Sequence, residues 1–283
     1  MIGIFDSGSG GLSVLREILR ILPKEKYVYY SDNANCPYGE KSVEFIRNRA
    51  REITRLLISK GAQIIVVACN TATAAAISVL REEFPVKFIG MEPAIKPAAL
   101  SSKTGVIGVL ATAGTLKASR YLNIKEMFGD GTKIAEHVGE GFVELVENGI
   151  LDGPEAEETV RKSVLPLVAA GADRIVLGCT HYPFLRKVIE RVAGPGVQVI
   201  DPAPAVARHL AEVMKQEGLL DHEYADVPAA VEPETEGQAA GEPEAAHPAA
   251  EIELIASGPE LPARRLLDTI ISGHAGWQTA TKA

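Results

Sequence analysis

Cysteine is scarce in this chain of 283 residues: there are three, Cys36, Cys69 and Cys179, and no two of them lie close together in sequence. An odd number of widely spaced cysteines argues against a disulfide framework and against a four-ligand zinc site. It favours reduced thiols, which are typical of the cytoplasm, so we expect a cytoplasmic protein with no bound metal. Each cysteine on its own could still be no more than a small apolar residue of the core.

Long apolar runs and an excess of basic residues are also missing. No apolar stretch approaches the roughly 20 residues that cross a bilayer, and the chain enters a strand pattern without a basic leader, so we expect no signal peptide and no membrane partner. The net charge is −8, but residues 221–263 hold eleven acidic residues and no Lys or Arg, which leaves +3 for the rest. Neither part has a basic stripe, so we expect no nucleic-acid partner.

The sequence does show alternating strand-like and helix-like apolar spacing. Strands are predicted over residues 2–5, 27–30, 64–68, 86–89, 197–200 and 252–256. Helices are predicted over residues 12–22, 42–60, 72–84, 205–218 and 262–271. This alternation is typical of the α/β class, and a chain of this length has room for about two domains.

Two segments of the sequence occur twice. Residues 61–71 (GAQIIVVACNT) are echoed by residues 171–181 (GADRIVLGCTH), 110 positions later and without a gap. Residues 2–7 are matched by residues 107–112 at an offset of 105. The repeats predict two pseudo-symmetric α/β domains with open, mainly parallel sheets and an active site in the cleft between them.

The domain limits follow from the repeats. We place the first domain at residues 1–97 plus 209–283 and the second at 98–208, because the last strand and helix have to return to one of the two units. Residues 224–250 are rich in Ala, Glu, Pro and Gly and have almost no large apolar residues. This composition predicts a flexible insertion in a discontinuous first domain.

In each copy, the predicted strand ends at a cysteine, Cys69 or Cys179. The carboxyl ends of strands are where open α/β sheets bind ligands, and two thiols that face one substrate suit a reaction without a preferred direction. Because the thiolate is the strong base, each cysteine needs a neighbour that can hold its proton. Asp6 is the candidate for Cys69 and His181 for Cys179. Alternatively, Asp6 caps the next helix and His181 is a polar residue at a strand end.

Neutral polar residues accompany the predicted strand ends. These side chains, with the helix N-termini that follow, are suited to hold carboxylates and an ammonium group; they are Asn70, Thr71, Thr112, Thr115 and Thr180. The absence of a basic cluster argues against a polyphosphate ligand. Residues 8–11 (GSGG) fit neither the dinucleotide fingerprint nor the P-loop, so we expect no nucleotide.

Six motifs together resemble a known family. They are IFDSG at 4–8, CPYG at 36–39, ACNT at 68–71, ATAGT at 111–115, LVE at 145–147 and LGCTHYP at 177–183. In this order they are similar to the glutamate racemase family, a cofactor-independent branch of the aspartate/glutamate racemase superfamily. The resemblance covers nearly the whole chain.

The resemblance implies interconversion of L- and D-glutamate, with D-glutamate supplied to peptidoglycan synthesis, without cofactor or metal and in a homodimer. It implies that Cys69 deprotonates the D-isomer and Cys179 the L-isomer, assisted by Asp6 and His181 respectively, with Glu147 as an auxiliary acidic group. The substrate contacts that it implies are Ser7, Tyr38, Gly39, Asn70, Thr71, Thr180 and His181; Asp6, Thr112 and Thr115 are added as candidates. Cys36 receives no role.

Two departures from the family pattern stand out. The insertion at 224–250 is longer than usual, and no segment precedes the first strand, so we expect no activation by a cell-wall precursor. An aspartate racemase, or a racemase of another amino acid with the same fold, is the nearest alternative. A two-lobed binding protein would usually carry an export signal, and a redox thiol enzyme would need a resolving cysteine nearby.

Overall fold

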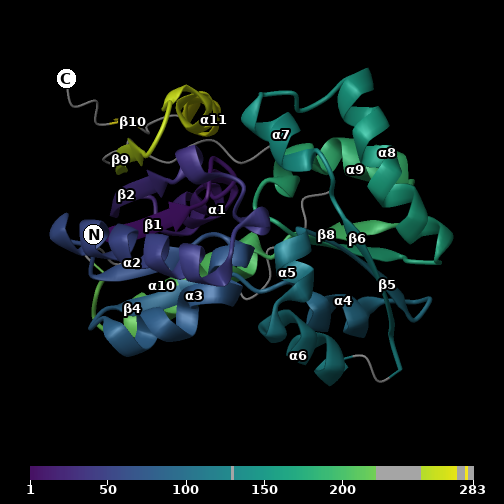
Figure 1. The fold of residues 1–283 in the computed structure, drawn as a ribbon, viewed down its shortest axis with the longest axis horizontal. Coiled ribbons are helices and arrows are strands. Elements are labelled where there is room, and N and C mark those ends of the chain that lie inside the picture. The colour runs from purple at the N-terminus through teal and green to yellow at the C-terminus, as the bar shows by residue number, and fades with distance from the viewer. Residues whose placement is uncertain (129–130, 221–249, 273–277, 280–283) are drawn as a thin grey trace.

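The chain forms two α/β lobes that lie side by side (Figure 1). The computed structural model describes residues 1–128, 131–220, 250–272 and 278–279. One sheet has the strand order β10-β9-β2-β1-β3-β4 and the other β6-β5-β7-β8, and all strand pairs are parallel. The order β2-β1-β3-β4 in the first lobe matches β6-β5-β7-β8 in the second. The fold class is therefore as predicted, and the sequence repeat corresponds to a structural repeat.

The first lobe contains the six-stranded sheet and the helices that pack on it. Its elements are β1 (Ile2–Asp6), α1 (Leu12–Ile21), β2 (Lys26–Ser31), α2 (Val43–Ser59), β3 (Ile64–Val67), α3 (Asn70–Glu83), β4 (Lys87–Gly90), α10 (Ala203–Gln216), β9 (Glu251–Ala256), α11 (Leu261–Ser272) and β10 (Gln278–Thr279). Two short 3-10 turns, Asn33–Asn35 and Tyr38–Glu40, follow β2.

The second lobe contains the four-stranded sheet. Its elements are α4 (Ile95–Ser101), β5 (Val106–Ala111), α5 (Ala113–Lys117), α6 (Ser119–Phe128), β6 (Lys133–Val138), α7 (Phe142–Glu147), α8 (Pro154–Ala169), β7 (Arg174–Gly178), a 3-10 turn (Tyr182–Leu185), α9 (Arg186–Ala193) and β8 (Gln198–Ile200). Within the described ranges, no helix combines the length and the apolar character that a membrane span needs.

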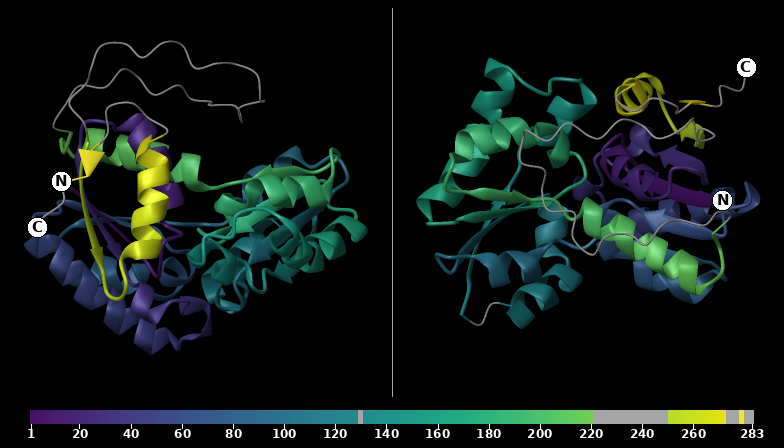
Figure 2. Two further views of the ribbon diagram at one scale, coloured as in Figure 1. Left: turned by 90° about the horizontal axis from the view of Figure 1, so that it is seen from above. Right: turned by 180° about the vertical axis from the view of Figure 1, so that it is seen from behind.

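Helices cover both faces of each sheet because successive strand side chains point to opposite sides. In β1, Ile2 and Ile4 pack with α1, α10 and α11, whereas Phe5 packs with α2 and α3. Figure 2 shows α11 beside α1 on one side of the first sheet. In the second lobe, α8 and α9 cover one face, and α4 and α6 cover the other.

The repeated glycines end the helices that precede the cysteine strands. Gly61 follows α2 and Gly171 follows α8, with φ angles of 95° and 92°. This left-handed conformation costs glycine little and stops the helix. The chain can then enter β3 and β7 in the same way in both lobes.

The predicted elements match the observed ones to within a few residues, but the cysteines lie beyond the strands. β3 ends at Val67 and β7 at Gly178, so neither strand has a cysteine as its last residue. Helix α3 begins at Asn70, two residues earlier than predicted, and Cys69 is its N-cap. The backbone has therefore already left the ladder at Cys69 in order to start the helix.

The late strand β9 pairs with β2 and so belongs to the first sheet. The predicted limit at 208–209 falls inside α10, which packs along α1 and against β4. We therefore propose that the second domain ends before α10, near residue 202. The predicted insertion at 224–250 lies outside the described residues, except for Ala250.

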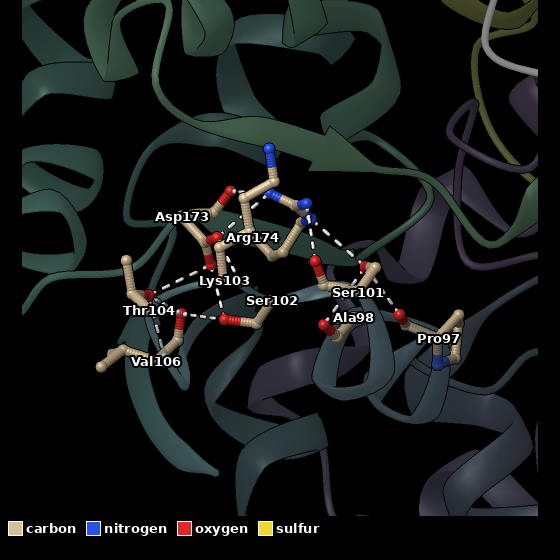
Figure 3. Close-up of polar contacts among 9 residues, drawn as sticks. All are labelled: Pro97, Ala98, Ser101, Ser102, Lys103, Thr104, Val106, Asp173 and Arg174. Atoms are coloured by element: carbon tan, nitrogen blue, oxygen red, sulfur yellow. Dashed lines mark hydrogen bonds and ion pairs between the residues drawn. The ribbon is translucent and has the colours of Figure 1, made fainter.

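A polar cluster fixes the start of the second lobe (Figure 3). The Asp173 carboxylate accepts hydrogen bonds from Ser102 Oγ at 2.6 Å, from the Lys103 backbone N–H at 2.7 Å and from Thr104 Oγ1 at 3.2 Å. Arg174 donates to the Ser101 carbonyl at 2.7 Å. These bonds hold the segment between α4 and β5 against the start of β7, the strand that ends at Gly178 directly before Cys179.

Candidate active site

Both predicted acid/base cysteines line one small pocket between the lobes. From the first lobe come Ser7, Pro37, Tyr38, Gly39, Cys69, Asn70 and Thr71, and from the second Thr112, Val143, Cys179, Thr180 and His181. The carboxyl ends of the two sheets face each other there, as the repeat predicts. Asp6, Thr115 and Glu147 do not line the pocket and lie behind residues that do.

Cys69 is buried at the start of α3. Its sulfur accepts a hydrogen bond from the Ala72 backbone N–H at 3.4 Å and lies 3.8 Å from Ser7 Oγ. Asp6 ends β1 and is fully buried; Oδ2 accepts N–H bonds from Gly8 at 3.3 Å and Gly11 at 2.9 Å. Asp6 therefore holds the turn before α1, but the capping alternative is wrong, because Gly11 is the N-cap of that helix and no side chain caps it. The Cys69 side chain is close enough to Asp6 to act on its pKa.

Burial keeps the first thiol in its neutral form. It raises the pKa of Cys69 well above the usual thiol value, and the negative charge of Asp6 raises it further. Burial also raises the pKa of Asp6, although the positive charge of His181 opposes that shift. At neutral pH Cys69 is accordingly a thiol that can donate a proton.

The second thiol has a different partner. His181 Nδ1 lies 3.8 Å from Cys179 Sγ, and Nε2 lies 2.7 Å from Glu147 Oε1. Glu147 also accepts hydrogen bonds from the backbone N–H of Ser9 at 2.7 Å and from its hydroxyl at 2.9 Å. The three side chains thus form a Cys–His–Glu series.

Electrostatics favour a charged imidazole in this series. Burial alone lowers the pKa of His181, but hydrogen bonds with Cys179, Cys36 and Glu147 outweigh it, and the net shift is well upward. Burial likewise raises the pKa of Glu147, but the hydrogen bond and charge of His181 outweigh it, and the net shift is downward. The charged imidazole lies 3.8 Å from Cys179 Sγ, where it can exchange a proton with the sulfur.

The glycine-rich turn before α1 is pressed against this histidine. A Cβ atom added at Gly10 would lie 2.4 Å from Nδ1 of His181, and one added at Gly8 would lie 2.4 Å from Oε1 of Glu147. No other residue type fits at these two positions without displacing the second acid/base group. Residues 8–11 therefore serve close packing and match no phosphate loop.

Polar contacts connect the lobes around the pocket. Ser13 Oγ donates to the Thr180 carbonyl at 2.9 Å, and the Thr180 hydroxyl lies 3.4 Å from Asp6 Oδ1. On the other side, Thr71 Oγ1 lies 3.0 Å from Thr112 Oγ1 and 3.2 Å from Thr115 Oγ1. Thr115 is thus a support for Thr71 and Thr112.

Asn70 has free hydrogen-bonding capacity beside the thiols. Its side chain is 4% exposed, and within the described part of the chain neither its amide nitrogen nor its oxygen has a hydrogen-bond partner. A buried polar group without a partner is costly unless a ligand satisfies it. The amide therefore marks the part of the pocket wall that a polar ligand would contact.

Tyr38 lines the pocket, but its hydroxyl points to a group that the sequence analysis missed. It donates to Asp32 Oδ2 at 2.5 Å, and Asp32 is fully buried. Arg49 of α2 binds the same carboxylate with Nη2 at 2.7 Å and Nε at 3.0 Å. Asp32 and Arg49 hold the loop that presents Tyr38 and Gly39, and no sequence motif pointed to them because they act only through tertiary contacts.

The two thiols follow equivalent strands of the duplicated parallel sheet, and each has its own acid/base partner. This arrangement defines a class of site that is suited to proton transfer on two faces of one small molecule. Comparison with known proteins identifies the family. The Asp/Glu/Hydantoin racemase family matches residues 2–210, and this chain belongs to that family.

Individual relatives give the same result. The chain is 50% identical over 224 residues to the glutamate racemase of Methylococcus capsulatus, covering 79% of this chain and 83% of the relative. Its structure is similar to that of glutamate racemase RacE1 from Bacillus anthracis, with a TM-score of 0.79, 30% identity and coverage of 100% and 97%. It is also similar to Escherichia coli glutamate racemase in complex with L-glutamate and the activator UDP-MurNAc-Ala, with a TM-score of 0.76, 32% identity and coverage of 98% and 96%.

Proposed function

We propose that this protein is a glutamate racemase in which Cys69 and Cys179 act as the two acid/base groups. The single observation that carries the mechanism is that both thiols line one enclosed pocket from opposite lobes. The glutamate racemases among the relatives support glutamate as the substrate over aspartate.

Proton transfer in this pocket balances without any other reactant. One thiolate removes the proton from Cα, the electron pair stays on the substrate as a carbanion, and the opposite thiol returns a proton to the other face. The first cysteine ends as a thiol and the second as a thiolate, ready for the reverse reaction. Cys69 acts as the base for the D-isomer and Cys179 for the L-isomer.

The partners of the two thiols fit these roles. The Cys69 thiol, with its raised pKa, is the proton donor when L-glutamate is converted. The charged His181, held by Glu147, faces the sulfur of Cys179, the group that removes the proton from L-glutamate. Asp6 and His181 thus assist opposite half-reactions.

The neutral polar lining supplies the substrate contacts. We assign these to Ser7, Tyr38, Gly39, Asn70, Thr71, Thr112, Thr180 and His181, with Asp6 and Thr115 behind them. The pocket has room for little more than a water molecule, so the lobes must part to admit glutamate and close again around it.

Deuterium incorporation tests the two-base mechanism. In deuterated water, each enantiomer should first yield product that carries deuterium at Cα, while recovered substrate stays largely unlabelled. Equal labelling of substrate and product from the outset would indicate one base and contradict the assignment. Polarimetry with D-glutamate, and with D-aspartate as control, tests the substrate.

The proposal also covers the cellular location, the oligomeric state and the biological role of the enzyme. We propose that it works in the cytoplasm as a homodimer and supplies D-glutamate for peptidoglycan synthesis. Its family relationship is the support for this proposal. Size measurement in solution tests the homodimer, and rescue of a bacterial strain that requires D-glutamate tests the supply of D-glutamate.

A further inference from the structure

Three potential metal ligands meet beside the candidate acid/base pair. The Cys36 sulfur, a Glu147 carboxylate oxygen and a His181 ring nitrogen lie within 4.8 Å of one another. Cys36 is half-buried in the segment between β2 and α2, Glu147 ends α7, and His181 follows β7. The cluster therefore joins the first lobe to the second.

The three donor atoms converge on one place. A Cβ atom built on Gly8 would lie 2.4 Å from Glu147 Oε1, 3.0 Å from Cys36 Sγ and 3.2 Å from His181 Nε2. The three donor atoms therefore all pack around Gly8, where no side chain comes between them. A cation bound by all three has to lie on the side of the donors that faces away from the Gly8 backbone.

We propose that Cys36, Glu147 and His181 form a binding site for a divalent cation of the zinc class, and that the bound cation inhibits the enzyme. A thiolate, an imidazole and a carboxylate select Zn²⁺ or Co²⁺ over Mg²⁺ and Ca²⁺, which prefer oxygen ligands. The cation is an inhibitor and not a cofactor, so the expectation of a reaction without metal is unchanged.

The geometry suits tetrahedral coordination after small side-chain movements. Zinc bonds of about 2.3 Å to sulfur and about 2.0–2.2 Å to nitrogen and oxygen place the donor atoms about 3.3–3.6 Å apart. His181 Nε2 and Glu147 Oε1 are now 2.7 Å apart and have to separate slightly. Binding displaces the protons held by the Cys36 sulfur and by Nε2, and leaves the fourth position to water.

Inhibition rests on the proposed function and has two causes. The cation takes over the Glu147 carboxylate and the Nε2 atom, so His181 can no longer carry the proton that assists Cys179. The cation also clamps residue 36 of the first lobe to residues 147 and 181 of the second. The lobes can then no longer part to exchange substrate and product.

Titration of the chelator-treated protein with Co²⁺ alone tests the site. We expect about one tetrahedral Co²⁺ per chain, with a near-ultraviolet thiolate-to-cobalt charge-transfer band. The band should vanish in Cys36→Ala, which removes the sulfur donor, and in Gly8→Ala, whose added Cβ would lie 2.4 Å from Glu147 Oε1 and displace that donor. It should persist in the matched control Cys69→Ser. No band in the parent protein, or a band that survives in Cys36→Ala, overturns the proposal.

Racemase assays with Zn²⁺ test the inhibition. Measured against its own turnover without metal, Cys36→Ala should raise the half-inhibiting Zn²⁺ concentration roughly tenfold or more, while Mg²⁺ has no effect on either protein. Equal inhibition of both proteins overturns the proposed inhibition. A Co²⁺ band in a protein without racemase activity would contradict the proposed function alone. Full activity without a Co²⁺ band would contradict the cation site alone.

Discussion

Glu147 Oε1 lies 2.7 Å from Nε2 of His181, on the opposite side of the ring from the Cys179 sulfur. The carboxylate therefore stabilises positive charge on the ring, and the other ring nitrogen faces the sulfur of Cys179. Cys69 has no equivalent histidine, because Thr71 stands at the matching position of the repeat. The two halves of the site thus share their backbone and differ in electrostatics.

Single-cysteine variants should separate the two half-reactions. Cys69→Ser and Cys179→Ser should each lower kcat for racemisation by a factor of roughly 10²–10⁴, because one proton donor is missing. Cys69→Ser should still exchange the Cα proton of L-glutamate with deuterated water, and Cys179→Ser that of D-glutamate, as NMR would show. The opposite pattern would reverse the assignment of the two faces. Cys36→Ala, which keeps both pocket thiols, should still racemise both enantiomers.

Asp6→Asn should shift the pH dependence of turnover. Asp6 raises the pKa of Cys69 through its charge, so the neutral amide should lower this pKa and Cys69 should ionise at lower pH. Since each half-reaction needs one thiol and one thiolate, the alkaline limb of the kcat/KM profile should move to lower pH. The shift must be equal in both directions, because L- and D-glutamate have equal free energies. An unchanged alkaline limb would show that Asp6 does not act on Cys69.

Glu147→Gln should weaken the second acid/base group. The amide can still contact His181, but without the charge the pKa of His181 should fall and the imidazolium should be less populated. We expect kcat to decrease about tenfold or more, as measured by polarimetry with either enantiomer. Turnover at the parent level would show that the carboxylate has no part in catalysis.

The same variant should reveal a pH-dependent contribution to stability. The raised pKa of His181 contributes stability that is full below about pH 6.5 and is lost as the pH rises through the folded-state value. The lowered pKa of Glu147 contributes stability that is full above about pH 4.3 and is lost as the pH falls through the folded-state value. The difference in Tm between the parent protein and Glu147→Gln should therefore be largest at about pH 5–6. A difference that is independent of pH would exclude this pair as its source.

Arg49→Met should loosen the loop that carries Tyr38 and Gly39. The substitution leaves the Asp32 carboxylate buried without its cation. The free energy of unfolding should fall by roughly 2–3 kcal/mol, less than for a fully buried pair because Arg49 is partly exposed. The KM for glutamate should rise. Arg51→Met on the same helix is the matched control, since Arg51 pairs with Glu83 at the surface. Its Tm and KM should stay close to those of the parent protein. Equal effects of the two changes would contradict the role of Asp32.

Gly10→Ala should displace His181, because the added Cβ would lie 2.4 Å from Nδ1. We expect kcat to fall clearly, whereas the circular dichroism spectrum, which reports the fold, should change little. Gly196→Ala is a suitable control, since nothing lies within 4 Å of its added Cβ. Assays of both variants together with their circular dichroism spectra check the prediction.

The sequence predicted the α/β class and most element limits of the first lobe from its apolar periodicity. In the second lobe it predicted the strands of the repeats and residues 197–200, but neither β6 nor any of the helices α4 to α9. It placed Cys69 and Cys179 at strand ends to within two residues, and it named each side chain that lines the pocket except Pro37 and Val143. It missed Asp32 and Arg49, which support the Tyr38 loop from outside the motifs. It also gave Cys36 no role, because its proximity to His181 arises from the meeting of two lobes.

The sequence by itself determined the duplication, the two thiols and the family, since these reside in local patterns and in their repeat. The tertiary structure decided which groups act together. Asp6 comes close to Cys69 because β1 and β3 are neighbours in the first sheet, and Glu147 meets His181 within the second lobe. The facing carboxyl ends of the two sheets bring the two thiols to one pocket. Their burial then sets the charge of each group, because desolvation and neighbouring charges depend on packing and not on sequence spacing.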